Sequence, residues 1–167
     1  MHVRRGDFAQ QYKHVLVSAE HIYDRIKNII EPNSTLFIAT DDKNKTYFEP
    51  LTRYYDVCFL DDFADEIKDM SSSLFGIIDQ IIVAKGEVFF GTSYSTLSAY
   101  VNRLRGYYSS KYKMPGYELG ELQSFYFSPP ERYRLMTRYH APAGSLWADE
   151  YPMAWRDIDH GIPEVQQ

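Results

Sequence analysis

The chain has 167 residues and a formal net charge of −5, with 23 Asp and Glu against 18 Lys and Arg. This length is sufficient for one domain with a substantial apolar core. The negative charge argues against nucleic acid as the main partner, because such binding requires a basic stripe. No apolar run approaches the roughly 18 residues of a membrane span. The charged N-terminus also lacks a signal-peptide pattern, which says nothing about any longer parent protein.

The cysteine and histidine contents exclude an intrachain disulfide framework and disfavour a structural metal. Cys58 is the only cysteine and lies in an apolar run, so we predict a buried thiol. The five histidines are scattered singly along the chain. Two Asn-x-Thr sequons begin at Asn33 and Asn44, which is compatible with passage through a secretory compartment.

The first 60 residues alternate short apolar runs with helical patterns. Strands are expected at residues 2–5, 36–39 and 57–60. Ser18 is a plausible N-cap for a helix whose apolar stripe ends before Pro32. A second helix is expected over residues 43–54, although Pro50 should break or kink it.

The alternation continues through a long apolar segment in the middle of the chain. Serines at 71–73 can cap a helix through Val83 that is apolar nearly all round, so we expect it to be deeply buried. A strand at 88–90 follows, and the next helix opens at Ser95 and Thr96.

The pattern changes from about Tyr107, where the sequence becomes rich in Tyr, Ser, Gly and Pro. We therefore divide the chain into a Rossmann-like unit at 1–106 and an irregular, aromatic-rich extension at 107–167 that packs on the same domain. One short helix is expected around residues 130–138. Apolar strands that alternate with helices indicate an α/β fold, a parallel sheet with helices on both faces.

Polar residues follow the predicted strands at the end where such a sheet binds ligands. They are Arg4, Arg5, Gly6 and Asp7, then Thr40, Asp41 and Asp42, then Asp61 and Asp62, and finally Gly91, Thr92, Ser95 and Thr96. Arginine forks and a hydroxyl-rich helix start are both suited to phosphate. Neither a P-loop nor a GxGxxG fingerprint is present. The alternative is a solvated turn, whose surface ion pairs contribute less than about 1 kcal/mol each.

Asp79 interrupts the apolar run Gly76-Ile77-Ile78-Asp79-Gln80-Ile81-Ile82. An unpaired carboxylate in a buried helix is costly. Asp79 either faces a polar seam of the helix or meets the donor groups of a ligand. Guanine suits the second interpretation, because its N1–H and exocyclic amine present two parallel donors to one carboxylate.

Several of these segments together resemble the GDP-fucose protein O-fucosyltransferases and their α1,6-fucosyltransferase relatives. The similar segments, in order, are His2-Val3-Arg4-Arg5-Gly6-Asp7, Phe37-Ile38-Ala39-Thr40-Asp41-Asp42, Asp79-Gln80, Phe89-Phe90-Gly91-Thr92-Ser93-Tyr94-Ser95-Thr96-Leu97-Ser98, Arg103-Leu104-Arg105 and the tail from Trp147 to Trp155-Arg156-Asp157. The resemblance spans almost the whole chain.

The resemblance implies a role for each matching residue. Arg4 would grip the pyrophosphate and stabilise the departing GDP, which makes it the expected catalytic residue. His2 and Val3 would flank the nucleotide, Asp79 would read guanine, and Ser95 and Thr96 would bind the phosphate and sugar. Arg5 belongs to the same donor site, and the expected secondary positions are Asp7, Asp41, Asp42, Gly91 and Thr92. Leu97 stands where the group often has Phe.

The resemblance also implies a two-lobed GT-B fold, of which this chain carries the C-terminal, donor-binding lobe. The expected reaction moves fucose from GDP-fucose to a Ser/Thr or glycan hydroxyl, in the endoplasmic reticulum or Golgi lumen. The acceptor-binding N-terminal lobe would be a missing partner. No metal or other cofactor is implied, although Asp41 and Asp42 leave a divalent cation open. The alternatives are a non-catalytic GDP-sugar-binding module or pseudoenzyme, and an incomplete gene model.

Overall fold

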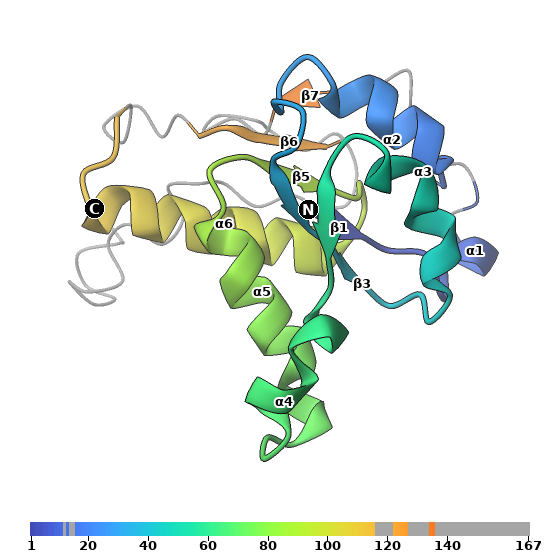
Figure 1. Cartoon of the computed structure of the whole chain (residues 1–167). Helices are drawn as coiled ribbons and strands as arrows, with labels where there is room; N and C mark the ends of the chain where they lie inside the picture. The colour runs from blue at the N-terminus through green and yellow to red at the C-terminus, as the bar shows by residue number, and fades with distance from the viewer. Residues whose placement is uncertain (12, 14–15, 116–121, 127–133, 136–167) are drawn as a thin grey trace.

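The computed structural model describes residues 1–11, 13, 16–115, 122–126 and 134–135 (Figure 1). The strands are β1 (His2–Val3), β2 (Thr35–Phe37), β3 (Ala39–Thr40), β4 (Asp56–Cys58), β5 (Phe89–Gly91), β6 (Ser124–Tyr126) and β7 (Arg134–Leu135). The α-helices are α1 (Phe8–Gln11), α2 (Ala19–Ile26), α3 (Glu49–Thr52), α4 (Ala64–Ile67), α5 (Phe75–Lys85) and α6 (Thr96–Lys111). Short 3-10 helices are η2 (Lys45–Phe48), η3 (Leu60–Phe63) and η4 (Ser72–Leu74).

Parallel strand pairs confirm the α/β class. β1 pairs in parallel with β3, β2 with β4 and β5 with β6, while β7 is antiparallel to β6. Only Ile38 separates β2 from β3, and β1 lies beside β5. Across the molecule the strands therefore follow in this order: β4, then β2 together with β3, then β1, β5, β6 and β7. They form three small sheets and not the single sheet we expected, because Ile38 interrupts the strand between β2 and β3 and no backbone ladder joins β1 to β5 in the described residues.

Helices cover both sides of these strands (Figure 1), with α2 and α3 on one side and α5 and α6 on the other. Side chains alternate along a strand, so neighbours serve opposite cores. Ile38 and Phe90 join the cluster that includes Ile22 and Ile26 of α2. Ala39 and Phe89 join the cluster that includes residues of α5 and α6. The uninterrupted apolar strands of the sequence are explained by this two-sided burial.

The first helices begin as their capping residues suggest but are shorter than expected. The Ser18 hydroxyl accepts a 3.3 Å hydrogen bond from the His21 amide, which confirms this N-cap. The expected helix over 43–54 is instead η2 followed by α3, with Pro50 in the first turn of α3. Proline is favoured there because its missing N–H would have no partner in a first turn. Pro50 thus opens a helix and does not break one.

Two apolar features are less buried than we predicted. Ile77 and Ile81 of α5 are 52% and 39% exposed, and in this helix only Val83 and Ala84 are buried. The expectation of a deeply buried helix was wrong, because α5 packs on α6 and β3 with one face only. Cys58 is half-buried at the end of β4, and burial raises the pKa of its thiol.

The sequence change at Tyr107 does not coincide with the end of a helix, since α6 continues to Lys111. β6 then pairs with β5, so regular structure extends into the predicted irregular tail. The short helix expected around 130–138 was wrong at Arg134–Leu135, which form β7. The remainder of that helix and the tail from Trp147 to Asp157 lie outside the described residues.

A buried arginine of α6 fastens the helical layer to the strands. The Arg105 guanidinium donates to the Ser124 hydroxyl at 2.8 Å and to the carbonyls of Ala84, Gly86, Glu87 and Gln123. Two of these carbonyls belong to the end of α5, where a cation is favourable. Burial lowers the pKa of Arg105 to about 10, which leaves the side chain charged at neutral pH. Arg105 therefore has a structural role.

Candidate functional site

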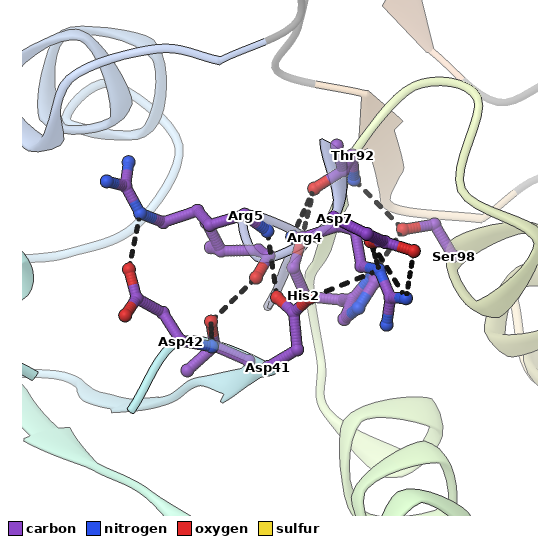
Figure 2. A network of polar contacts seen from close by, with 10 residues as sticks. His2, Arg4, Arg5, Asp7, Asp41, Asp42, Thr92 and Ser98 are labelled. Carbon is purple, nitrogen blue, oxygen red and sulfur yellow. Dashed lines mark hydrogen bonds and ion pairs between the residues drawn. The ribbon is translucent and has the colours of Figure 1, made fainter. Parts of the chain in front are cut away.

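The ends of β1, β3 and β5 bring polar residues together, as the strand-end rule predicted (Figure 2). Arg4 and Arg5 follow β1 directly, and Asp41 and Asp42 follow β3. The two guanidiniums leave β1 in opposite directions (Figure 2), and each meets a different carboxylate. The adjacent arginines therefore occupy distinct environments.

Arg4 is held by carboxylates from two segments. Its Nε and Nη2 atoms donate to the two oxygens of Asp7 at 3.0 and 3.1 Å, and its Nε lies 3.3 Å from the Asp41 carboxylate. The hydrogen bond from Arg4 holds the pKa of Asp7 below its usual range. Both partners reach solvent, with 31% of the Arg4 side chain and 58% of the Asp7 side chain exposed. Exposed pairs of this kind are worth about 1 kcal/mol or less, so a stronger anion could replace them.

Arg5 is built into the surrounding structure. Its Nε donates to Asp42 at 2.7 Å, and its guanidinium carbon lies 3.5 Å from the centre of the Tyr47 ring. The Arg5 amide donates to Asp41 at 2.8 Å. A Cβ on Gly6 would lie 2.5 Å from the same Asp41 carboxylate, so Asp41 fills the space beside this glycine.

A buried hydrogen-bond network joins β1 to the start of α6 (Figure 2). The Thr92 hydroxyl donates to the His2 carbonyl and accepts from the Arg4 amide, both at 3.0 Å. Ser98 lies 2.7 Å from the His2 Nδ1 atom and accepts from the Thr92 amide at 2.9 Å. Burial, with help from the Arg4 charge, lowers the pKa of His2 to about 3, so the imidazole is neutral. This network sets the position of the backbone that carries Arg4.

A pocket of about 370 Å³ opens beyond these strand ends. Its walls carry the residues His2, Arg4, Ile38, Ala39, Thr40, Asp41, Asp42, Lys43, Lys45, Phe59, Leu60, Asp61, Phe75, Gly76, Asp79 and Leu97. The pocket therefore combines cations and carboxylates with aromatic and aliphatic surface, which is typical of a site for a small-molecule ligand.

Asp79 lines this pocket, and one of its carboxylate oxygens, Oδ1, is buried and has no hydrogen-bond partner among the described residues. The pKa of Asp79 is raised to about 6, mainly by burial, with Lys45 opposing the shift and Asp61 adding to it. A buried acceptor without a donor is costly. Because Oδ1 has no partner, the first interpretation of Asp79, a polar seam of the helix, is not supported at this atom. The oxygen retains its capacity to accept a hydrogen bond, as the second interpretation, a ligand, requires.

The remaining predicted residues lie in different places. The Val3 side chain packs in the core with Leu36. Ser95 is buried and Thr96 is exposed at the start of α6, and neither lines the pocket, whereas Leu97 does. Gly91 ends β5, and Thr92 acts through the network described above.

The sequence reasoning gave no site role to several pocket residues, among them Lys45, Phe59 and Phe75. The Lys45 ammonium lies 3.7 Å from Asp61 and 4.8 Å from the centre of the Phe59 ring. Phe59 directly follows β4, so the strand-end rule could have identified it. Phe75 and Asp79 are one helical turn apart on α5, a spacing that places them on the same face.

Two further properties concern the described part of the chain. In it, no three His, Cys, Asp or Glu side chains are grouped so that they could hold a metal ion. A search of the same residues finds no helix that is both long and apolar enough to span a bilayer.

The fold and the site together define an α/β protein that gathers arginines, carboxylates and a helix start at the carboxyl edge of its parallel strands. The chain belongs to the GDP-fucose protein O-fucosyltransferase family, whose model matches residues 3–108. The matched range includes the second residue of β1 and the arginines that follow it, the acidic loop after β3, α5 and most of α6. No curated protein and no solved structure matches the chain. The family is one of glycosyltransferases of the secretory pathway.

Proposed function

We propose that this chain is the donor-binding half of a fucosyltransferase that moves fucose from GDP-fucose to a hydroxyl group. One observation supports this proposal above all others. The pocket is lined by Arg4 and by Asp79, whose carboxylate oxygen Oδ1 is buried and has no hydrogen-bond partner among the described residues. A nucleoside diphosphate carries the complementary groups, an anionic pyrophosphate and a base with N–H donors.

The base would lie against α5. Asp79 would accept hydrogen bonds from the guanine N1–H and amine, and Phe59 and Phe75 supply apolar surface nearby. The order of the strands supports this placement. β1 and β5 are neighbours at the middle of the series. From β1 the strands continue toward β4, and from β5 they continue in the opposite direction toward β7, so the strand order reverses between β1 and β5. Doubly wound α/β proteins bind nucleotides at such a reversal.

The pyrophosphate would replace the present partners of Arg4. Arg4 is bound to Asp7 and Asp41 at the solvent-exposed rim, where each ion pair contributes little. A phosphate accepts both arms of the guanidinium and carries more charge. The ammonium of Lys45, which also lines the pocket, adds to the positive potential there. Ser95 and Thr96 remain our candidates for the phosphate and sugar at the start of α6.

In the proposed reaction, the bond between the anomeric carbon and the β-phosphate oxygen breaks while an acceptor oxygen bonds to the opposite face of that carbon. The leaving GDP takes the electron pair, and Arg4 stabilises the charge that develops on it. The acceptor hydroxyl gives up its proton to a base. We assign this base and the acceptor site to a first lobe that would complete the enzyme, and we assign no metal to the step.

We place the protein in the lumen of the endoplasmic reticulum or Golgi, as its family suggests. Asn33 and Asn44, which begin the two sequons, are both exposed. Both positions are therefore accessible for glycosylation in that compartment, which supports the placement.

Titration calorimetry of the chain with GDP, GDP-fucose, ADP and UDP tests the donor assignment. We expect GDP and GDP-fucose to bind and the other two nucleotides to bind at least about tenfold more weakly, a difference of about 1.4 kcal/mol. Equal binding of all four nucleotides would show that Asp79 does not recognise guanine. If the folded chain bound none of them, the assignment of a donor site would be wrong.

A further inference from the structure

Lys45 is a cation of the pocket at the strand ends in addition to Arg4. It is the first residue of η2, and the Asn44 side chain caps this helix by accepting from the Thr46 amide at 3.1 Å. The Lys45 ammonium donates to the Asp42 carbonyl, also at 3.1 Å. These contacts fix the start of η2 and direct the lysine back over the loop after β3, with 32% of its side chain exposed.

The Lys45 ammonium has donors to spare. An ammonium carries three N–H groups, and the Asp42 carbonyl is the one hydrogen-bond acceptor that Lys45 meets among the described residues. Its ion pair with Asp61 spans 3.7 Å, and 75% of the Asp61 side chain is exposed. A pair of this kind contributes little to stability. The ammonium can therefore donate to a ligand without losing a strong contact.

Lys45 lies on the same side of the pocket as Asp79. Its ammonium is 4.8 Å from the centre of the Phe59 ring, and Phe59 follows β4, whereas Arg4 follows β1. In the strand order, β2 and β3 lie between these two strands. The pKa of Asp79 is raised mainly by burial, and Lys45 is the strongest of the charges that act on this carboxyl. Ammonium and carboxylate are thus neighbours, yet the described ion pairs join Lys45 to Asp61 and leave Oδ1 of Asp79 without a partner.

A carboxylate next to an ammonium is complementary to one edge of guanine. This edge presents in a row the O6 acceptor, the N1–H donor and the amine donor. Asp79 can accept from the two donors, and Lys45 can donate to O6. Adenine has an amine in the place of O6 and an acceptor at N1, so both contacts would be repulsive. Uracil has a carbonyl where guanine has its amine, so Asp79 would face an acceptor.

We propose that Lys45 is a specificity-determining residue of the nucleotide site, whose ammonium donates to O6 of the base that Asp79 recognises. This inference rests on the proposed function, because it requires a guanine nucleotide in the pocket. Asp79 selects a base with N–H donors, and Lys45 adds the requirement for an acceptor beside them. The two residues together read the whole edge, which neither reads alone.

Calorimetry of the full chain at neutral pH tests this contact with GDP and 6-thio-GDP, in which sulfur, a weak acceptor, replaces O6 while both donors remain. We expect the wild type to bind GDP about tenfold more tightly, as for one hydrogen bond to a charged group. Lys45→Met should bind both nucleotides equally, because GDP loses this contact. Lys45→Arg keeps a donor and should retain part of the preference.

Two comparisons separate the O6 contact from other effects of the charge. Lys43 also lines the pocket and is exposed, so Lys43→Met is the matched control. Loss of its charge should weaken GDP and 6-thio-GDP by equal factors. IDP keeps O6 and N1–H and lacks the amine, so Lys45→Met should weaken IDP by the same factor as GDP.

Two results would overturn the role of Lys45 and leave the donor site in place. Equal binding of GDP and 6-thio-GDP by the wild type would show that O6 is not recognised. Equal weakening of both nucleotides by Lys45→Met would make this lysine a general source of positive potential. Failure of the folded wild type to bind either nucleotide would instead overturn the proposed function, and the role of Lys45 with it.

Discussion

At the scale of single residues, Arg4 and Arg5 make a matched pair of probes. Arg4 lines the pocket at the strand ends, whereas Arg5 does not and is stacked on Tyr47. Arg4→Lys keeps the charge and loses the bidentate fork. We expect it to weaken GDP binding by about tenfold or more, which is about 1.4 kcal/mol, in calorimetry. Arg5→Lys is the control, and we expect it to change GDP affinity less. Equal affinity of wild type and Arg4→Lys would remove Arg4 from the site.

Asp79 should make stability and binding depend on pH in opposite directions. Burial raises its pKa to about 6 in the folded chain, above the unfolded value near 3.8. Between these values the folded state binds more protons, so the free energy of unfolding should fall as pH rises from about 4 to about 6. GDP needs the ionised carboxylate, so GDP affinity should instead rise over the upper part of this range.

Asp79→Asn should remove both trends and reduce the preference for GDP over ADP and UDP. Urea unfolding and calorimetry at about pH 5 and about pH 7.5 measure the two effects separately. If the variant loses thermal stability and keeps its nucleotide preference, Asp79 is a structural residue. The polar-seam interpretation would then be correct.

At the scale of elements, Thr92 replaces a backbone ladder between β1 and β5. Its hydroxyl bonds both the His2 carbonyl and the Arg4 amide and is fully enclosed. Thr92→Val keeps the shape and removes both hydrogen bonds, so we expect a loss of about 1–3 kcal/mol in the free energy of unfolding from urea denaturation. Thr92→Ser keeps the hydroxyl and should cost less. Similar losses for both variants would show that the Thr92 methyl group matters more than its hydrogen bonds.

The exposed face of α5 is a second property of an element. Leu74, Ile77 and Ile81 lie on one side of the helix and are 40%, 52% and 39% exposed. Such a stripe promotes self-association. The double variant Ile77→Lys, Ile81→Lys should reduce the sedimentation coefficient at high concentration, with the unfolding free energy changed by only about 0.5 kcal/mol. Tyr112→Lys, at the end of α6, is the control for an exposed residue outside the stripe. Unchanged association in the double variant would exclude this face.

At the scale of the whole molecule, we expect residues 1–167 to bind GDP-fucose and transfer no fucose. We assign leaving-group stabilisation to Arg4 and acceptor positioning to another lobe. Positioning of reactants contributes roughly 7–11 kcal/mol in well-oriented cases, so its loss should abolish the rate. Fucose transfer to folded cysteine-rich repeats and to N-glycans is the assay, with GDP binding as the control for folding. Robust turnover would show that the chain is a sufficient catalyst.

Local features of the sequence predicted much of this arrangement. The Ser18 cap, the strands predicted at 36–39 and 57–60, which overlap β2, β3 and β4, and the helix start at Thr96 depend on short-range preferences that the chain retains when folded. The convergence of Arg4 and Asp41 also follows from local information, because parallel strands end at the same edge. Family membership rests on such motifs in a fixed order.

Other properties depended on neighbours far away in the chain. An apolar helix has the same periodicity whether or not something covers it, so the sequence of α5 could not reveal that Ile77 is exposed. Which of two adjacent arginines faces the pocket is decided by the pairing of β1, and Tyr47, 42 positions away from Arg5, holds the other one. Residue types and local order were thus determined by the sequence alone. Burial, side-chain direction and the unpartnered oxygen of Asp79 were decided by tertiary packing, because each depends on atoms that only the folded chain brings together.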